Sequence, residues 1–387
     1  MLSEKNIAIV GGGPGGLTLA RLLQMKGAQV KVYERDFSQA ARVQGAIVDL
    51  HFDSGLKAIE ATGLMEAFKA NYMKGADKYR LLDPQGNILM DESEREEGPL
   101  FGDEHFRPEI DRGALRDLLI DGLFPGTVVW DSQLVSMQET GDSWRLQFKN
   151  GMSATADLVI GSDGYRSAVR PYLTDVKALY SGAAIIQGEI DHPKNTCPKI
   201  YDLVNHGNLM AMGNGASLVV QPRSDGGFTF YAASMYPENW SISCGIDFCN
   251  AEEVRRYLKK HFANWNPIFF MLFEASGHFT WRPLNYFPLE QRWSAKNKIT
   301  LIGDAAHLMP PNGEGVNLAM LDALDLCNCL TSRSNTTIKD AISAYEHIMF
   351  ERAVPLCRET IDGIADFASP STESVQELVR MLSHNRS

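Results

Sequence analysis

The sequence of 387 residues has no long hydrophobic run and more acidic than basic residues, and each feature excludes a class of protein. No apolar stretch approaches the roughly twenty residues that a membrane-spanning helix needs. Only residues 1–6 precede the first apolar run, which leaves no room for a signal peptide, so we expect a cytoplasmic protein without a membrane partner. The net charge of −11 argues against nucleic acid as a partner, because its phosphate backbone is also anionic.

Cysteine and histidine patterns that mark disulfide or metal sites are also missing. The six cysteines include no Cys-x-x-Cys pair, and Cys327 and Cys329 lie two apart in a predicted helix, where they point to different faces. Free thiols in a reducing compartment are therefore our interpretation. No His-x-x-x-His pair or cysteine cluster indicates a metal site.

The length and composition favour a large globular protein. With 44% hydrophobic and 22% charged residues, the composition is ordinary for a folded, water-soluble chain. A chain of 387 residues exceeds most single small cores, so we expect one large domain or two fused domains. No internal repeat or low-complexity tract stands out.

A strand–helix–strand pattern opens the chain. Residues 7–10 form a short apolar run that ends at glycine, which predicts a buried parallel strand. Residues 14–25 predict a helix with leucine and alanine on its inner face, and residues 30–33 predict a second strand. Together these segments predict one βαβ unit.

The loop of this unit has the glycine spacing of a dinucleotide-binding site. Gly11 would permit a tight turn, Gly13 would let the backbone approach a pyrophosphate, and Gly16 would let the helix pack against the strand. The free N–H groups and the dipole at the helix N-terminus favour an anion there. Glu34, at the end of the second strand, can accept hydrogen bonds from ribose hydroxyls and disfavours a 2′-phosphate. The pattern predicts FAD or NAD here, and not NADP.

A second loop of this kind follows the apolar run 299–302. Asp304 stands at the end of this predicted strand, where it can accept hydrogen bonds from another ribose or ribityl hydroxyl; an ordinary helix N-cap is the alternative. The proline-rich segment 310–315 and the helix that opens near Gly315 bring further backbone N–H groups to the ligand. Two such loops at opposite ends of the chain suggest that the chain folds back to hold one large ligand with two phosphates.

The remaining patterns predict a discontinuous first domain with a second domain inserted into it. Helices are predicted over 111–123, 252–262, 315–330, 338–364 and 374–382. Strands are predicted over 78–82 and 88–91 as a hairpin, over 128–130, 133–138 and 144–148 as antiparallel strands, over 157–160 as a buried strand, and over 183–190, 218–221 and 228–232 in a separate sheet. We divide the chain into a dinucleotide-binding domain over 1–171 and 289–335, a substrate-binding domain over 172–288, and a helical segment over 336–387.

Three motifs, in this order and spacing, resemble the para-hydroxybenzoate hydroxylase family of single-component FAD monooxygenases over nearly the whole chain. The motifs are 11–16 with Glu34; Asp163-Gly164 followed by Arg166, Ser167 and Arg170; and 303–307 through Asn317 and Asp322. The resemblance implies an α/β protein: a Rossmann-like FAD-binding domain, an inserted, mainly antiparallel β-sheet substrate domain, and a C-terminal helix. It also implies that Asp163 and Gly164 serve both flavin and nicotinamide binding, and that Asp304 holds the ribityl chain.

A closer resemblance is to the tetracycline-inactivating monooxygenases, the tetracycline destructases. It rests on the segments 33–36, 41–42, 48–51, 108–110 with Arg112, 115–116 and 307–311. By this likeness Arg42, Asp49, Arg116 and Asp304 would contact FAD or the reductant. Arg112 and Arg116 lie four apart and so share a helix face, for which a solvated surface is the alternative. The expected cofactor-binding residues are Gly11, Gly13, Gly16, Glu34, Arg35, Arg42, Asp49, Arg112, Arg116, Asp163, Asp304, Pro311, Gly313, Gly315, Val316 and Asn317.

The loop over 310–315 departs from the family pattern. Where the family has Gly-Gln-Gly, this chain has Gly313-Glu314-Gly315, and the loop is one residue shorter. A carboxylate near the flavin would disfavour the anionic reduced ring, unless Glu314 points outward or is protonated.

The inserted domain differs from the destructases at two of the three positions that hold their substrate. Destructases hold the polar edge of their substrate with Gln, Arg and His; Gln187 matches the first, whereas Asn208 and Phe230 stand at the other two. The substrate site is then more apolar, or it accepts a different molecule. The expected substrate-binding residues are Gln187, Asn208, Met210, Phe230 and Pro311, and the candidates for an apolar wall are Met210, Met212, Phe230, Tyr231, Met309 and Pro311.

Missing motifs narrow the flavoenzyme classes. No second Gly-x-Gly-x-x-Gly loop is present, which argues against reductases with two dinucleotide domains. Residues 281–283 do not complete the Trp-x-Trp-x-Ile-Pro stretch of flavin halogenases. His307 belongs to the third motif, and we interpret it as structural and not as a base.

The resemblance implies a monomeric FAD-dependent monooxygenase that uses NADPH or NADH as a transient reductant and O₂ as co-substrate. It would hydroxylate an electron-rich aromatic or enol compound through a flavin C4a-hydroperoxide, with tetracycline inactivation as the leading candidate. Because the chemistry belongs to the flavin, we expect no catalytic acid or base from the protein. The alternatives are a hydroxylase of another aromatic compound and an FAD-binding sensor that does not turn over.

Overall fold

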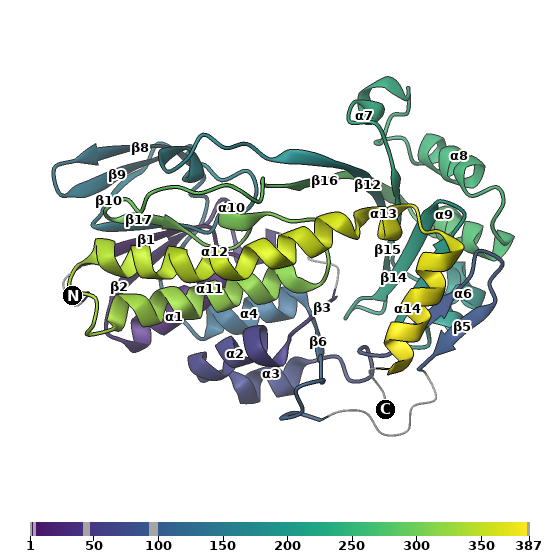
Figure 1. Ribbon diagram of the computed structural model, residues 1–387, viewed down its shortest axis with the longest axis horizontal. Helices are drawn as coiled ribbons and strands as arrows, with labels where there is room; N and C mark the ends of the chain where they lie inside the picture. The colour runs from purple at the N-terminus through teal and green to yellow at the C-terminus, as the bar shows by residue number, and fades with distance from the viewer. Residues whose placement is uncertain (1, 3–4, 42–46, 93–99, 385–387) are drawn as a thin grey trace.

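The computed structural model describes residues 2, 5–41, 47–92 and 100–384, with side chains to residue 380. The chain forms two domains side by side, one built around a parallel sheet and one around a larger mixed sheet (Figure 1). Arg42, an expected cofactor contact, lies outside the described residues.

The parallel-sheet domain has its strands in the order β17-β11-β1-β2-β7. Their bounds are Ile299–Leu301 for β17, Leu158–Gly161 for β11, Asn6–Val10 for β1, Gln29–Tyr33 for β2 and Val128–Val129 for β7. All neighbouring pairs are parallel. Strands β11 and β17 are buried at every position, as expected for a parallel sheet that is covered on both faces.

A small antiparallel sheet covers one face of the parallel sheet. Its strands are β8 (Leu134–Thr140), β9 (Ser143–Phe148) and β10 (Ser153–Ala156) (Figure 1). Phe148 stacks on Tyr33 of β2 with the ring centroids 4.6 Å apart. The prediction of antiparallel strands is confirmed for β8 and β9. It is wrong for residues 128–130, because Val128 pairs in parallel with Val32; so short a run carries no pattern that reveals strand direction.

Helices cover the other face (Figure 1). They are α1 (Pro14–Met25), α11 (Glu314–Thr331) and α12 (Ile338–Asp362), flanked by α2 (Lys57–Thr62), α3 (Met65–Asn71) and α4 (Arg112–Asp121). Helices α1 and α11 approach closely at Gly15, where an added Cβ would lie 2.8 Å from the backbone oxygen of Ala319. The missing side chain at Gly15 therefore brings the first helix of the chain against one of the last.

The mixed-sheet domain has its strands in the order β16-β12-β15-β14-β13-β4-β5. Their bounds are His278–Tyr286 for β16, Leu179–Ile190 for β12, Phe228–Met235 for β15, Ala216–Pro222 for β14, Asn208–Gly213 for β13, Tyr79–Leu82 for β4 and Ile88–Asp91 for β5. The outer face packs on α6 (Pro198–Val204), α8 (Ala251–His261) and α9 (Phe270–Ala275), and α5 (Pro193–Thr196) and α7 (Trp240–Ser243) lie in the connections. The inner face packs on α13 (Ile364–Ala368) and α14 (Thr372–His384).

The observed sheets change the expected division of the chain. The hairpin β4–β5 falls within 1–171, yet β4 pairs in parallel with β13 and so extends the mixed sheet. The predicted helix 338–364 ends at Asp362, and α13 begins at Ile364. Helix α12 packs on α11 of the first domain, whereas α13 and α14 cover the mixed sheet, so the segment 336–387 spans both domains (Figure 1).

A short ribbon lies between the two domains. It pairs β3 (Ile47–Asp49) with β6 (Glu109–Asp111) in antiparallel register, which sets Asp49 opposite Glu109 (Figure 1). Residues opposite each other on an antiparallel pair share one face of the ribbon. Two acidic side chains are therefore held near the domain boundary.

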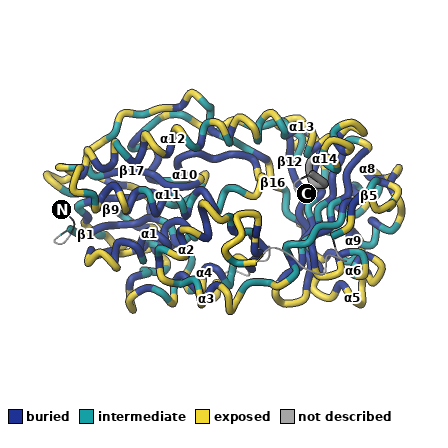
Figure 2. The backbone as a smooth tube through the Cα atoms, turned by 60° about the horizontal axis from the view of Figure 1, so that its bottom comes forward, coloured by how far each residue is buried: buried dark blue, intermediate teal, exposed yellow. Residues whose placement is uncertain are grey.

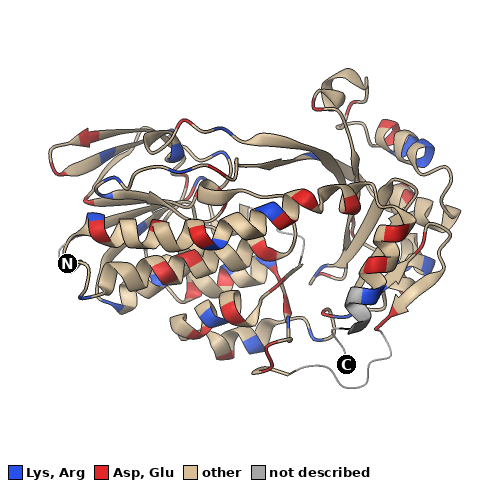
Figure 3. Ribbon diagram, viewed as in Figure 1, with Lys and Arg blue, Asp and Glu red and all other residues tan. Residues whose placement is uncertain are grey.

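Buried residues lie mainly in the sheets and in the helices packed on them, and charged residues are frequent on the outer helices. Figure 2 shows buried backbone along β1, β17 and α11, and exposed backbone on the outer helices such as α3 and α5. Figure 3 shows acidic and basic residues interspersed along α8 and α12. Most of them are exposed or half-buried, and Glu346 of α12 is buried. The buried hydrophobic residues form a large cluster in each domain, with smaller clusters where α13 and α14 meet the mixed sheet.

Phe230 and its neighbour Tyr231 lie on opposite faces of β15. Replacing each in turn compares the stability contributed by the outer core with that contributed by the inner face. Phe230 is fully buried against Phe273 and Phe279, with ring centroids 5.9 and 6.2 Å away. We expect Phe230→Ala to lower the free energy of unfolding by about 3–5 kcal/mol in denaturant titrations, because it leaves a cavity. The half-buried Tyr231 serves as the matched control, since Tyr231→Ala should cost clearly less. Equal losses would contradict this placement.

Candidate functional site

The predicted motifs all follow the carboxyl ends of neighbouring strands. Gly11 follows β1, Glu34 follows β2, Asp163 lies just beyond β11, and Asp304 lies just beyond β17. Because these strands are adjacent and parallel, their carboxyl ends share one edge of the sheet. Open α/β sheets bind ligands at this edge.

The first glycine loop has the geometry that its spacing predicts. Gly11 has a φ of 105°, and an added Cβ would lie 2.3 Å from the backbone oxygen of Ser162, so the loop rests on the second motif. An added Cβ on Gly16 would lie 2.3 Å from the oxygen of Gly11, which explains the close packing of α1 on the strand. An added Cβ on Gly13 would meet nothing within 4 Å. Gly13 therefore exposes backbone at the start of α1, where a phosphate group is favoured.

Glu34 and Arg116 brace this loop. Glu34 is 5% exposed, and its Oε2 accepts a hydrogen bond from the N–H of Gly12 at 2.7 Å. Arg116, also buried, donates from Nε to the oxygen of Gly12 at 3.3 Å and pairs with Asp36 at 3.2 Å. Its guanidinium lies 5.2 Å from the centre of the Trp130 ring. Arg116 thus holds the loop through the protein backbone, whereas Arg35, which follows Glu34 in the chain, is exposed.

The second motif is tied to the third by Arg170. Asp163 accepts a hydrogen bond from the N–H of Ala168 at 2.7 Å, and burial raises the pKa of its carboxyl. Arg170 donates to the oxygens of Ala305 and Ala306 at 3.0 and 3.2 Å, and its guanidinium stacks 3.5 Å from the centre of the Phe287 ring. These bonds fix the short helix α10 (Asp304–His307) relative to the turn that carries Asp163.

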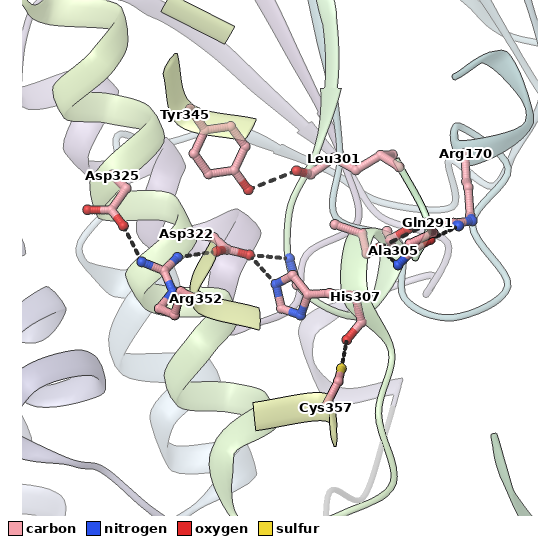
Figure 4. A network of polar contacts seen from close by, with 12 residues as sticks. Arg170, Gln291, Leu301, Ala305, His307, Asp322, Asp325, Tyr345, Arg352 and Cys357 are labelled. Carbon is pink, nitrogen blue, oxygen red and sulfur yellow. Dashed lines mark hydrogen bonds and ion pairs between the residues drawn. The ribbon is translucent and has the colours of Figure 1, made fainter. Parts of the chain in front are cut away.

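Asp322 anchors the second loop from behind (Figure 4). Its fully buried carboxylate accepts hydrogen bonds from the N–H of Gly303 at 2.8 Å and from Nε2 of His307 at 2.6 Å, and it pairs with Arg352 of α12 at 2.5 Å. Despite burial, the charges of His307 and Arg352 hold the pKa of Asp322 below its usual value. His307 is 4% exposed and committed to this network, which agrees with a structural role.

Asp304 itself faces away from this network. It is exposed, although its neighbours Ala305, Ala306 and His307 are buried. An added Cβ on Gly315 would lie 3.9 Å from Oδ1 of Asp304, so the carboxylate lies beside the start of α11. This position makes it available to accept hydrogen bonds from a ligand hydroxyl.

Asn317 closes the proline-rich loop onto β3. Its Nδ2 donates to the oxygens of Asp49 and Gly313 at 2.9 and 3.1 Å, and its Oδ1 accepts hydrogen bonds from the N–H groups of His51 and Gly55 at 2.8 and 3.2 Å. Asn317, expected to bind the cofactor, is fully buried and holds the loop through these four hydrogen bonds. Pro311 and Gly313 in this loop are exposed, and Val316 is half-buried.

The carboxylate that departs from the family pattern, Glu314, points to a histidine. Nδ1 of His51 lies 3.2 Å from Oε1 of Glu314, and Nε2 of His51 lies 2.8 Å from Oδ2 of Asp49. Burial alone would lower the pKa of His51, but the two carboxylates outweigh it and raise this pKa to about 9. The sequence motifs alone predict no role for His51. The signal that points to it is the acidic residue in the loop, since a half-buried carboxylate needs a partner.

The substrate candidates divide between the two faces of the mixed sheet. Gln187, Tyr231 and Met210 lie in one row across the inner face, because Gln187 pairs with Tyr231 and both Tyr231 and Met210 pair with Val219. Phe230 faces the outer core with no exposed surface, so we leave it out of the site.

Asn208 and two methionines also lie away from an open surface. Asn208 is 1% exposed, and its Nδ2 donates to the oxygen of Ala76 at 2.8 Å and to Oε1 of Glu109 at 3.2 Å. Burial and the charge of Asp49 raise the pKa of Glu109 to about 8. Met212 packs in the cluster beneath α14, and Met309 packs on Leu318 and Cys357.

The residues at this edge fit FAD. Glu34 and Asp304 present carboxylates at two strand ends, each able to accept hydrogen bonds from sugar-type hydroxyls. The starts of α1 and α11 both have glycine at the N-cap, Gly13 and Gly313, which has no side chain to cap the N–H groups that follow. In α11 the first of these N–H groups, that of Glu314, donates to Oδ1 of Asn312 at 3.0 Å. Two anion-favouring helix ends and two hydroxyl acceptors match a dinucleotide with two ribose-type chains.

Comparison with known proteins decides between the candidate dinucleotides. Residues 4–182 and 284–360 match the model of the FAD binding domain family. The chain belongs to this family. A monooxygenase of Emericella nidulans, asqM, is 29% identical over 91% of this chain and 93% of its own length. Family and relatives make this protein an FAD-dependent monooxygenase, which confirms the expected enzyme class and the FAD cofactor.

Solved structures of other proteins have the same fold as this chain. Klebsiella pneumoniae HpxO, complexed with FAD and uric acid, superposes with a TM-score of 0.78 at 21% identity, over 99% of this chain and 93% of that one. The tetracycline destructase Tet(55) superposes with a TM-score of 0.76 at 20% identity, over 99% of this chain and 96% of that one. The fold class implied by the sequence resemblance is thereby confirmed. Among the described residues, the helices are each too short or too polar to cross a membrane.

Replacement of Asp322 tests the anchor behind the second loop. We expect Asp322→Ala to lower the free energy of unfolding by about 3–5 kcal/mol, because it leaves the buried His307 and the N–H of Gly303 without their acceptor and takes one of two carboxylates from Arg352. Asp325 also binds Arg352 but is partly exposed, so the control Asp325→Ala should cost only about 1 kcal/mol. Thermal and denaturant unfolding measure both losses, and equal losses would contradict an anchoring role.

Replacement of Asp304 tests its availability to the cofactor. We expect Asp304→Ala to weaken FAD binding about tenfold to a hundredfold, since a hydrogen bond to a charged group contributes about 1.5–3 kcal/mol. The exposed Asp121 at the end of α4 provides the control, and Asp121→Ala should leave FAD affinity unchanged. Fluorescence titration of the apoprotein with FAD gives both values. An unchanged affinity for Asp304→Ala would show that Asp304 is only a helix cap.

Proposed function

We propose that this FAD monooxygenase consumes NADPH or NADH and hydroxylates an electron-rich aromatic or enol compound, with tetracycline as the leading candidate. Bound FAD supplies the oxygen chemistry, activating O₂ and delivering one oxygen atom to the substrate. The atoms balance when substrate, O₂, NAD(P)H and one proton give hydroxylated substrate, NAD(P)⁺ and water. The chain must then hold the cofactor, orient the substrate and exclude water.

The position of Arg112 carries the proposal. Although Asp304 is open to solvent, the surrounding protein partly desolvates its carboxyl and raises its pKa, as burial does for Tyr231. The charge of Arg112 opposes the shift at each of them. One exposed guanidinium at the start of α4 is thus within electrostatic reach of the expected ribityl acceptor and of the inner face of the mixed sheet. This supports a substrate on that face, beside the cofactor.

A second guanidinium favours an anionic substrate edge. Arg282 of β16 donates from Nε to Oε1 of Gln187, and its charge also lowers the pKa of Tyr231 against the effect of burial. The positive charges of Arg112 and Arg282 act at Tyr231 against the negative charge of Glu189, and would stabilise an ionised phenol or enol there. Ionisation makes the neighbouring carbon more electron-rich, so the same charges would promote oxygen transfer to that carbon.

The chain's own residues would divide the remaining work. Glu34 and Asp304 would accept hydrogen bonds from the cofactor's hydroxyls, and the N–H groups at the starts of α1 and α11 would face its negative charge. Gln187, Tyr231 and Met210 would contact the substrate from the mixed sheet. None of these roles requires a strong acid or base.

A smaller aromatic compound is the second candidate substrate. Asn208 is tied to Ala76 and Glu109, and Phe230 lies in the outer core, so neither adds a polar contact to the inner face. A face with few polar anchors suits a smaller or less decorated ring. Uric acid in the HpxO complex is an example of a small ligand held by this fold.

NAD(P)H oxidation in air tests the proposal. We expect the purified, FAD-loaded protein to oxidise NADPH or NADH faster when tetracycline is present, and to give a product that carries one oxygen atom from isotopically labelled O₂. Uric acid and simple hydroxybenzoates in parallel reactions separate the second candidate from the first. If Arg112 orients the substrate, Arg112→Gln should raise KM about tenfold or more, whereas Arg145→Gln, at an exposed position on β9, should not.

Two outcomes would contradict the proposal. If a ligand speeds NAD(P)H oxidation but gains no oxygen atom, the electrons pass to O₂ without hydroxylation of the ligand. No reduction of FAD by either nicotinamide, together with no stimulation by any phenol or enol, would favour an FAD-binding sensor.

A further inference from the structure

The loop that begins α11 places a carboxylate beside the expected flavin position. Glu314 is the first residue of α11, and the glycines on either side of it face acidic groups. An added Cβ on Gly313 would lie 3.6 Å from Oδ1 of Asp49, and one on Gly315 would lie 3.9 Å from Oδ1 of Asp304. A helix N-terminus favours one negative charge, so the Glu314 carboxylate and a negatively charged ligand would compete for it.

His51 is placed to remove this conflict. Its two ring nitrogens lie 2.8 Å from Asp49 and 3.2 Å from Glu314, and its side chain is 12% exposed. With its pKa raised to about 9, the ring is positively charged near pH 7. The third acidic group that acts on it is Glu109 of β6, whose pKa of about 8 leaves it mainly neutral there. The imidazolium therefore offsets one full negative charge at the loop.

We propose that His51 and Glu314 form a positioning pair that holds the loop 310–315 against β3 and lets the start of α11 accept the negative charge of reduced FAD. The proposal rests on FAD binding and not on the identity of the substrate. Asn317 supports the same arrangement, because it joins Gly313 to the backbone of Asp49 and His51. Neither partner touches the reacting atoms; each acts through the charge and the place of the loop.

The pair makes a specific prediction about charge. Removing the positive ring while the carboxylate stays leaves Glu314 to repel reduced FAD, so the reduction potential of bound FAD should fall in His51→Gln. Removing the carboxylate as well takes away the cause of the repulsion. The double variant with Glu314→Gln should therefore return towards the wild-type potential, and the two effects should not add.

The test measures the potential of bound FAD in the wild type, the two single variants and the double variant at pH 7. We expect a lower potential only in His51→Gln, with recovery in the double variant. As pH rises through about 9, the wild type loses the charge on His51 and should approach the potential of His51→Gln. His192 and Glu139 are exposed, so His192→Gln and Glu139→Gln provide matched controls that should leave the potential unchanged.

A second readout needs neither turnover nor substrate. The ring of His51 can be titrated by NMR in the FAD-loaded protein, and the apoprotein gives the same signal without cofactor. We expect the pKa of His51 to fall in Glu314→Gln, which replaces one carboxylate oxygen by an amide nitrogen and keeps the side-chain shape. Unchanged titration of His51 in Glu314→Gln, or equal potentials in all four proteins, would overturn the proposal. Failure of every tested substrate would leave both readouts unaffected.

Discussion

The close contact of the two glycine loops with helix α11 is the constraint on which the rest of the structure depends. Gly15, near the start of the chain, and Gly303, near its end, both lack a side chain where they face Ala319. A Cβ at either glycine would lie 2.8 Å from an atom of Ala319, so α1, β17 and α11 can meet only with glycine there. This meeting sets the carboxylates of Glu34 and Asp304 at one edge of the sheet, where a single dinucleotide can reach both.

The second loop is then held from two sides by histidines that lie between charged groups. On the buried side, His307 and Arg352 share the carboxylate of Asp322. On the open side, His51 lies between Asp49 and Glu314. The buried network fixes the position of the strand end, whereas the partly exposed pair can change its charge with pH. The stability of the loop and the charge near the expected flavin therefore depend on different residues around the same loop.

The sequence revealed local patterns well and cross-domain contacts poorly. The glycine loops, α1, and the strands at 7–10 and 299–302 follow from spacing and hydrophobicity, which act within a few residues. The pairing of β4 with β13 could not be seen, because a hairpin looks the same whichever sheet it extends. Alternation along the strand predicts that Phe230 and Tyr231 lie on opposite faces, but it does not reveal which face meets the cofactor domain. The partnership of His51 with Glu314 joins residues that only the folded chain brings together.

Both loops are expected to hold one FAD molecule, and competition by the two halves of FAD is the sharpest measurement of this. Titrations of the apoprotein with AMP, which is the half expected at Glu34, and with FMN, which is the half expected at Asp304, would be followed by FAD. We expect AMP and FMN to bind at the same time, one of each per chain, and one FAD to displace both. Binding of a second FAD, or displacement of only one fragment, would contradict it.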